Sequence, residues 1–114
     1  MKKFQSGRHT AAYLLLFLAQ SPNYGGQLLK MCEENLYANP IDSAILYRTL
    51  NALEKNGSIS AYWEREEKGK PKKWYQLTDL GREQLDEFYE DILSRQRNFT
   101  YFIDEYKQLE EVEQ

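Results

Sequence analysis

Four lysines lie close together between two short aromatic stretches of the sequence, where they offer positive charge for binding phosphate. They share one six-residue stretch that is broken by Gly69 and Pro71: Lys68, Lys70, Lys72 and Lys73. Ammonium groups at this density attract nucleic-acid phosphates, along the backbone or at the minor groove. Charged hairpin tips also occur as plain solvated turns, but four lysines in so short a segment favour a contact with phosphate.

A second set of polar residues lies near the start of residues 42–55, whose apolar side chains recur every three or four positions, as in an amphipathic helix. The set left near the outer, N-terminal face of that helix is Ser43, Ala44, Tyr47, Arg48 and Asn51. Arg48 and Asn51 suit the edges of guanine and adenine, whereas Ser43 and Tyr47 suit phosphates. Each of these residues is also compatible with an ordinary solvated position.

The elements that must position these residues follow from turn and cap signals. Residues 57–64 and 72–77 are short, aromatic and β-prone, so they predict a β-hairpin whose tip, 65–71, is basic. Trp74 and Tyr75 point to opposite faces of the second strand, so one of them is expected in the core. The sequence leaves open which of the two faces DNA, and Tyr75 is retained as a candidate contact.

Helices are predicted over residues 8–20, 24–35 and 42–55, with a last helix from 79 to 109 or beyond. Asp42 and Thr78 are natural N-caps, and Asn56-Gly57 supplies a left-handed stop. The fold class is therefore mainly α with a small β-hairpin wing. We expect a winged helix-turn-helix over residues 1–78 and a C-terminal dimerisation helix over 79–114, forming one compact unit.

The last predicted helix carries an apolar seam at heptad spacing, which only Arg95 interrupts. A helix of this length cannot bury such a seam inside one small domain, so pairing with a second copy is predicted. The first helix is expected to contribute two residues to that interface. The predicted dimer contacts are Tyr13, Phe17, Leu85, Phe88, Ile92, Phe99, Phe102 and Tyr106.

Catalytic and metal chemistry find no support in the residue types. His9 and Cys32 are the only histidine and the only cysteine, and they offer neither a metal cluster nor a nucleophile–base pair. No glycine-rich phosphate loop is present. We therefore expect no enzyme activity, no metal and no cofactor.

A single cysteine fits a reducing cytoplasm. The longest apolar run has nine residues, far fewer than the roughly 20 that a membrane helix needs.

The formal net charge of −3 conceals two parts of opposite sign. Residues 1–81 hold 11 Lys and Arg against 8 Asp and Glu, a net of +3, whereas residues 82–114 hold 4 against 10, a net of −6. Because phosphate responds to the local field, an acidic tail does not exclude binding to DNA by the rest of the chain.

The chain resembles the PadR family of transcriptional regulators over about residues 10–85. The matching residues are Tyr24-Gly25 with Leu28 and Leu29, Leu46-Tyr47 with Leu50, Leu53-Glu54, Gly57, Tyr62-Trp63, Lys73 to Thr78, and Gly81. Gly26 departs from the family, which usually has an aromatic residue there. The single last helix resembles the smaller branch of the family, which dimerises through that helix.

The resemblance implies a cytoplasmic repressor that binds double-stranded DNA as a homodimer on a pseudo-palindromic operator and that small aromatic ligands release. Phe88, Ile92 and Phe99 are the candidate effector contacts, although a filled dimer core is the simpler use of them. The alternative function is a winged-helix module of the anti-repressor type, which binds a protein and not DNA. The operator, the effector and the regulated genes are not specified by the sequence.

Overall fold

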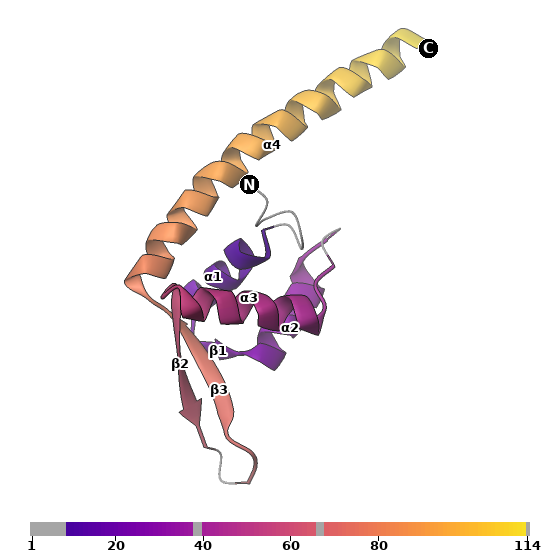
Figure 1. The fold of residues 1–114 in the computed structure, drawn as a ribbon. Helices are drawn as coiled ribbons and strands as arrows, with labels where there is room; N and C mark the ends of the chain where they lie inside the picture. The colour runs from indigo at the N-terminus through magenta and orange to yellow at the C-terminus, as the bar shows by residue number, and fades with distance from the viewer. Residues whose placement is uncertain (1–8, 38–39, 66–67, 114) are drawn as a thin grey trace.

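The computed structural model describes residues 9–37, 40–65 and 68–113 of the chain. Its elements, in chain order, are α1 (Thr10–Gln20), β1 (Asn23–Tyr24), α2 (Gly25–Asn35), α3 (Ser43–Lys55), β2 (Ile59–Glu64), β3 (Lys72–Leu77) and α4 (Asp79–Glu113) (Figure 1). The predicted fold class, mainly helical with a small β-hairpin, is confirmed.

Local side-chain signals set the helix ends as the sequence predicts. The Asp42 carboxylate accepts a hydrogen bond from the Ile45 amide at 2.8 Å, and the Thr78 hydroxyl accepts one from the Gly81 amide at 3.1 Å. After α3, Gly57 takes a positive φ of 88° and reverses the chain into β2. The first helix begins at Thr10, because His9 has a left-handed φ of 62°; Arg8, where it was predicted to begin, lies outside the described residues.

The sheet has one strand more than the sequence predicted. Asn23 and Tyr24 pair with Tyr75 and Trp74 of β3, and β2 pairs with the other edge of β3, so the antiparallel order is β1-β3-β2. Two residues are too few to show an alternating pattern, which is why β1 left no signal in the sequence. It ties the start of α2 to the base of the wing.

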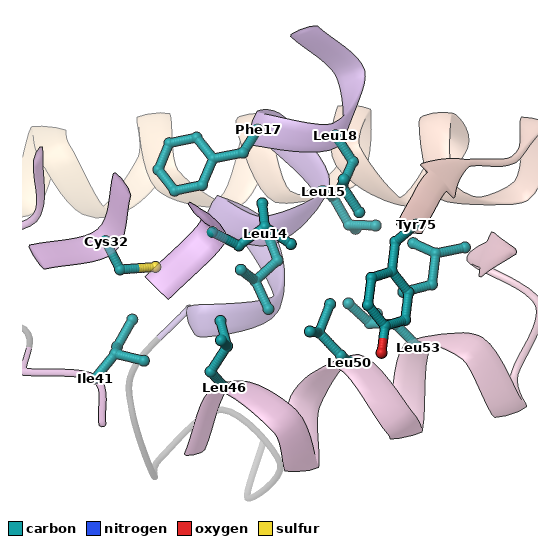
Figure 2. Close-up of a cluster of buried hydrophobic side chains, with 12 residues drawn as sticks. Leu14, Leu15, Phe17, Leu18, Cys32, Ile41, Leu46, Leu50, Leu53 and Tyr75 are labelled. Carbon is teal, nitrogen blue, oxygen red and sulfur yellow. The ribbon is translucent and has the colours of Figure 1, made fainter. Parts of the chain in front are cut away.

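The core lies between α1, α2, α3 and one face of the sheet (Figure 2). Each helix contributes the apolar side that its spacing predicts, and β3 contributes Tyr75. The side chains labelled in Figure 2 are Leu14, Leu15, Phe17, Leu18, Cys32, Ile41, Leu46, Leu50, Leu53 and Tyr75. This packing fixes how α3 and the wing sit relative to one another.

The long helix α4 leaves the core after its first turns and projects away from it (Figure 1). Leu85 and Phe88 pack against the core, Asp91 lies 3.3 Å from His9, and the helix then extends away from the core (Figure 1). Its 35 residues correspond to about 52 Å of helix, which explains a longest dimension of 66 Å against 28 and 24 Å for the other two. Among the described residues, no helix is both long and apolar enough to cross a membrane.

Candidate nucleic-acid interface

The outer face of α3 brings together the five residues predicted to contact DNA. All of them are exposed and fall within one side of the helix: Ser43, Ala44, Tyr47, Arg48 and Asn51. On the opposite side, Leu46, Leu50 and Leu53 are buried and anchor α3 on the core. The helix therefore presents a polar face with one arginine and one asparagine, side chains that pair with base edges.

The wing lysines divide into two that contact other elements of the protomer and two that are exposed near the tip, a difference that the sequence did not show. The Lys73 ammonium donates to the Glu54 carboxylate of α3 at 3.0 Å, and this hydrogen bond raises the pKa of Lys73. Lys72 lies over the ring of Tyr24, with its ammonium 4.2 Å from the ring centroid. Lys68 and Lys70 are exposed near the tip. The two tip lysines thus project from the molecule, whereas Lys73 fastens the wing to α3.

Tyr75 was retained as a DNA contact, and its position in the core contradicts that assignment. Only 3% of its surface is exposed, and burial raises the pKa of its hydroxyl. Trp74, on the other face of β3, packs edge-on against Tyr24 with ring centroids 5.2 Å apart. On the other neighbouring strand, Tyr62 of β2 is paired with Trp74, so an aromatic residue stands opposite Trp74 on each side.

Trp63 is an aromatic residue of this surface that the sequence analysis missed. It shares a sheet face with Ile59 and Ala61, but it lies beyond the core and is 65% exposed. With Tyr47 and Lys73 it lines a hollow at the junction of α2, α3 and the wing. The alternation of side chains along a strand was the signal that could have identified Trp63, because it places Ile59, Ala61 and Trp63 on the same face of β2.

The predicted dimer contacts fall into three groups by burial in the protomer. Phe17 packs in the core and is 6% exposed, so it is corrected from a partner contact to a contact within the protomer. Tyr13, Leu85 and Phe88 are half-buried against the core. The exposed members lie farther along α4: Ile92, Phe99, Phe102 and Tyr106. Tyr89, Tyr101, Ile103, Leu109 and Val112 are exposed on the same helix and were not in the predicted set.

The three predicted effector contacts are not brought together in one protomer. Phe88 lines a hollow of about 440 Å³ between α1, α3 and α4, and neither Ile92 nor Phe99 is part of that lining. At its edge the Asp91 carboxylate accepts one hydrogen bond from Arg95 Nε at 2.9 Å and lies 3.3 Å from the His9 imidazole. The bond from Arg95, and then that from His9, lower the pKa of Asp91.

The groups that carry chemistry in enzymes are not assembled in the part of the chain that the structure describes. No cluster of three or more histidine, cysteine, aspartate or glutamate side chains there could hold a metal ion. Cys32 is buried, and burial raises the pKa of its thiol to about 11, so it is a neutral thiol at physiological pH. This is the behaviour of a packing residue rather than a nucleophile.

Comparison with known proteins found both a sequence family and similar structures. The family described as "Transcriptional regulator PadR-like family" matches residues 14–87. A PadR family transcription regulator from hypervirulent Clostridium difficile superposes with a TM-score of 0.74 at 20% identity, over 83% of this chain and 98% of that chain. A transcriptional regulator from Clostridium thermocellum gives 0.71 at 24% identity, over 82% and 89%.

A further structural neighbour is more similar in sequence. Pex from Synechococcus is 30% identical, with a TM-score of 0.60 over 74% of this chain and 79% of that chain. No significant match was found among curated proteins. The two clostridial structures support the fold, and the family match covers the core, α3, the wing and the first turns of α4.

Proposed function

Because the chain belongs to the PadR-like family of transcriptional regulators, we propose that it is a repressor that binds duplex DNA as a homodimer on a pseudo-palindromic operator. The winged helix-turn-helix, residues 1–78, reads DNA, and residues 79–114 join the two copies. As a regulator the protein has no catalytic role, and it acts on DNA in the cytoplasm.

The observation that carries this proposal is the exposed polar face of α3 beside a wing with lysines at its tip. The α3 helix is held by Leu46 and Leu50 from one side only, so the side with Arg48 and Asn51 is available to a major groove. Lys68 and Lys70 are placed to meet the neighbouring backbone or minor groove. Their exposed ammonium groups bind phosphate without reading sequence.

The exposed apolar side chains of α4 support the homodimer. Monomers rarely expose apolar patches of more than a few hundred Å². Here large apolar side chains follow one another along turns that touch no other part of the described chain, among them Phe99, Phe102 and Tyr106. A second α4 laid along this side buries them. Two α3 helices carried by such a dimer suit half-sites about 34–36 Å apart.

The proposal includes release from DNA by a small aromatic ligand. It draws on the family resemblance and on the aromatic side of α4, where Phe88, Ile92 and Phe99 of two copies come together only in a dimer. A ligand shifts the protein off DNA only if it binds the DNA-incompetent state more tightly. Both tryptophans, Trp63 and Trp74, lie in the wing, so their fluorescence reports on the DNA-binding part of the molecule during a titration.

The test is binding to a duplex that the parent protein enriches from a random-sequence pool, measured at two salt concentrations. Binding that is specific and weakens with salt is expected. Arg48→Ala is expected to relax the preference at particular base pairs by about 1–3 kcal/mol. Ser94→Ala, an exposed polar change on α4, is the control and keeps the parent's preference. A parent that binds no duplex at low salt contradicts the repressor and favours the alternative, a winged-helix module that binds protein.

A further inference from the structure

Gly25, the first residue of α2, lies so close to Tyr47 of α3 that a side chain at position 25 would displace the Tyr47 ring. A Cβ added at Gly25 meets the Tyr47 ring, with Oη at 2.5 Å, Cε1 at 2.6 Å and Cζ at 2.7 Å. These separations are well below carbon van der Waals contact, which is optimal at about 3.5–4.0 Å. The phenol of Tyr47 therefore rests directly on the backbone of Gly25.

The glycine is explained by this contact and not by its backbone conformation. Among the described glycines only Gly57 has a positive φ, so the chain at Gly25 does not require glycine. Gly26, the next residue, makes a sharp contrast, because a Cβ there meets only the Tyr24 ring at 3.5 Å, an ordinary contact. Gly25 is buried and Gly26 is exposed. Of these two adjacent glycines, Gly25 is the one whose Cβ position is occupied by the Tyr47 ring.

The seat on Gly25 holds Tyr47 at the meeting point of three elements. Tyr47 is 43% exposed, so its contact with Gly25 leaves part of the residue open to solvent. Trp63 of β2 and Lys73 of β3 line the same hollow, and the Lys73 bond to Glu54 ties the wing to α3 beside it. The Tyr47 hydroxyl oxygen thus lies against Gly25, and the hollow that Tyr47 lines is shared by α2, α3 and the wing, between the two surfaces proposed to contact DNA.

We infer that Gly25 is a positioning residue for DNA binding: by lacking a side chain it seats Tyr47 so that its hydroxyl donates to a DNA phosphate at the junction of α3 and the wing. The inference rests on the proposed function, since it assigns a contact within that DNA-binding surface. Alanine is a better helix former than glycine, so helix propensity alone makes a glycine-to-alanine change neutral or favourable at both positions. We expect the change to be unfavourable only at position 25, where the added Cβ meets the Tyr47 ring.

The experiment compares Gly25→Ala with its matched control Gly26→Ala, by urea unfolding and by affinity for the duplex that the parent enriches from a random-sequence pool. Gly26→Ala is expected to match the parent in both measurements. Gly25→Ala is expected to lower the unfolding midpoint and to weaken DNA binding at least about tenfold, since the displaced hydroxyl loses a hydrogen bond to a charged group. Equal binding by the two variants overturns the inference.

Two further variants show whether Gly25 acts through Tyr47. In a Tyr47→Ala background, Gly25→Ala is expected to change neither the unfolding midpoint nor the affinity, because the ring it displaces is gone. If Gly25→Ala alone does not fold, recovery of folding in the double variant supports the seat, and failure to recover overturns it. A loss of the same size with and without Tyr47 also overturns it.

Tyr47→Phe separates the DNA contact from packing. It keeps the ring on its seat and removes only the hydroxyl, so the unfolding midpoint is expected to stay unchanged while DNA affinity falls by roughly 10- to 100-fold. An unchanged affinity reduces Tyr47 to a packing residue and overturns the inference. If the parent itself binds no duplex, the proposed function fails and the DNA role of Gly25 fails with it. A DNA-binding parent with insensitive variants overturns the inference alone.

Discussion

Phe99 offers a direct measurement of how strongly α4 joins two copies of the chain. Its side chain is 62% exposed in the protomer, and burying a whole phenylalanine side chain contributes about 1.5–3 kcal/mol. Burying the exposed part in a dimer is therefore worth about 1–2 kcal/mol. A two-fold interface contains the residue twice, so Phe99→Ala is expected to cost about 2–4 kcal/mol, or roughly a 30- to 1,000-fold weaker dimer.

The assay is sedimentation equilibrium over a dilution series, which gives the dimer dissociation constant directly. Alanine has a higher helix propensity than phenylalanine, so the change does not weaken α4 itself. Gln108→Ala is the control, since nine residues at 100° each place it on the opposite side of the same helix. It is expected to dimerise like the parent. A parent that stays monomeric at tens of micromolar, or a Phe99→Ala variant indistinguishable from Gln108→Ala, refutes the interface.

Three further predictions follow from charges and pKa values. The double change Lys68→Ala and Lys70→Ala is expected to weaken binding to all DNA sequences. Because each of the two protomers loses two lysines, the slope of log affinity against log salt is expected to fall by about four, which salt-dependent gel shifts measure. Because burial raises the pKa of the Cys32 thiol to about 11, alkylation at neutral pH is expected to be far slower than for an exposed thiol and to accelerate on unfolding in urea. The pKa of Asp91 is lowered mainly by Arg95, so its stabilising contribution is present above the ordinary aspartate value of 3.8 and is lost as pH falls below it. Arg95→Gln is therefore expected to lose less stability than the parent on acidification, as followed by urea unfolding at several pH values.

Each of the three has a contradicting outcome. An unchanged salt slope in the lysine variant removes the wing tip from the DNA surface. Rapid alkylation of Cys32 in the folded protein contradicts its burial. If the stability of Arg95→Gln and that of the parent fall equally on acidification, the exposed pair of Arg95 and Asp91 does not affect stability.

Local signals in the sequence were sufficient to predict most of the secondary structure. Asp42, Thr78 and Gly57 act on amides and carbonyls within a few residues of themselves, so their effect on helix ends does not depend on the rest of the fold. The spacing of apolar residues likewise marked the buried side of α3, and with it the exposed side that carries Arg48 and Asn51. For the same reason the heptad pattern of α4 was readable before its exposure was known.

Contacts between distant segments were decided only by the tertiary structure. Strand alternation shows that Trp74 and Tyr75 point to opposite sides, but which side is core depends on where the helices pack, and they cover Tyr75. Lys73 could be told from Lys70 only once β3 lay beside Glu54 of α3. The contact of Gly25 with Tyr47 joins residues 22 positions apart, so no local pattern in the sequence showed which glycine of the Gly25-Gly26 pair lies against that ring. Composition and periodicity act over a turn of helix or a pair of strands, whereas these assignments depend on how complete elements pack against each other.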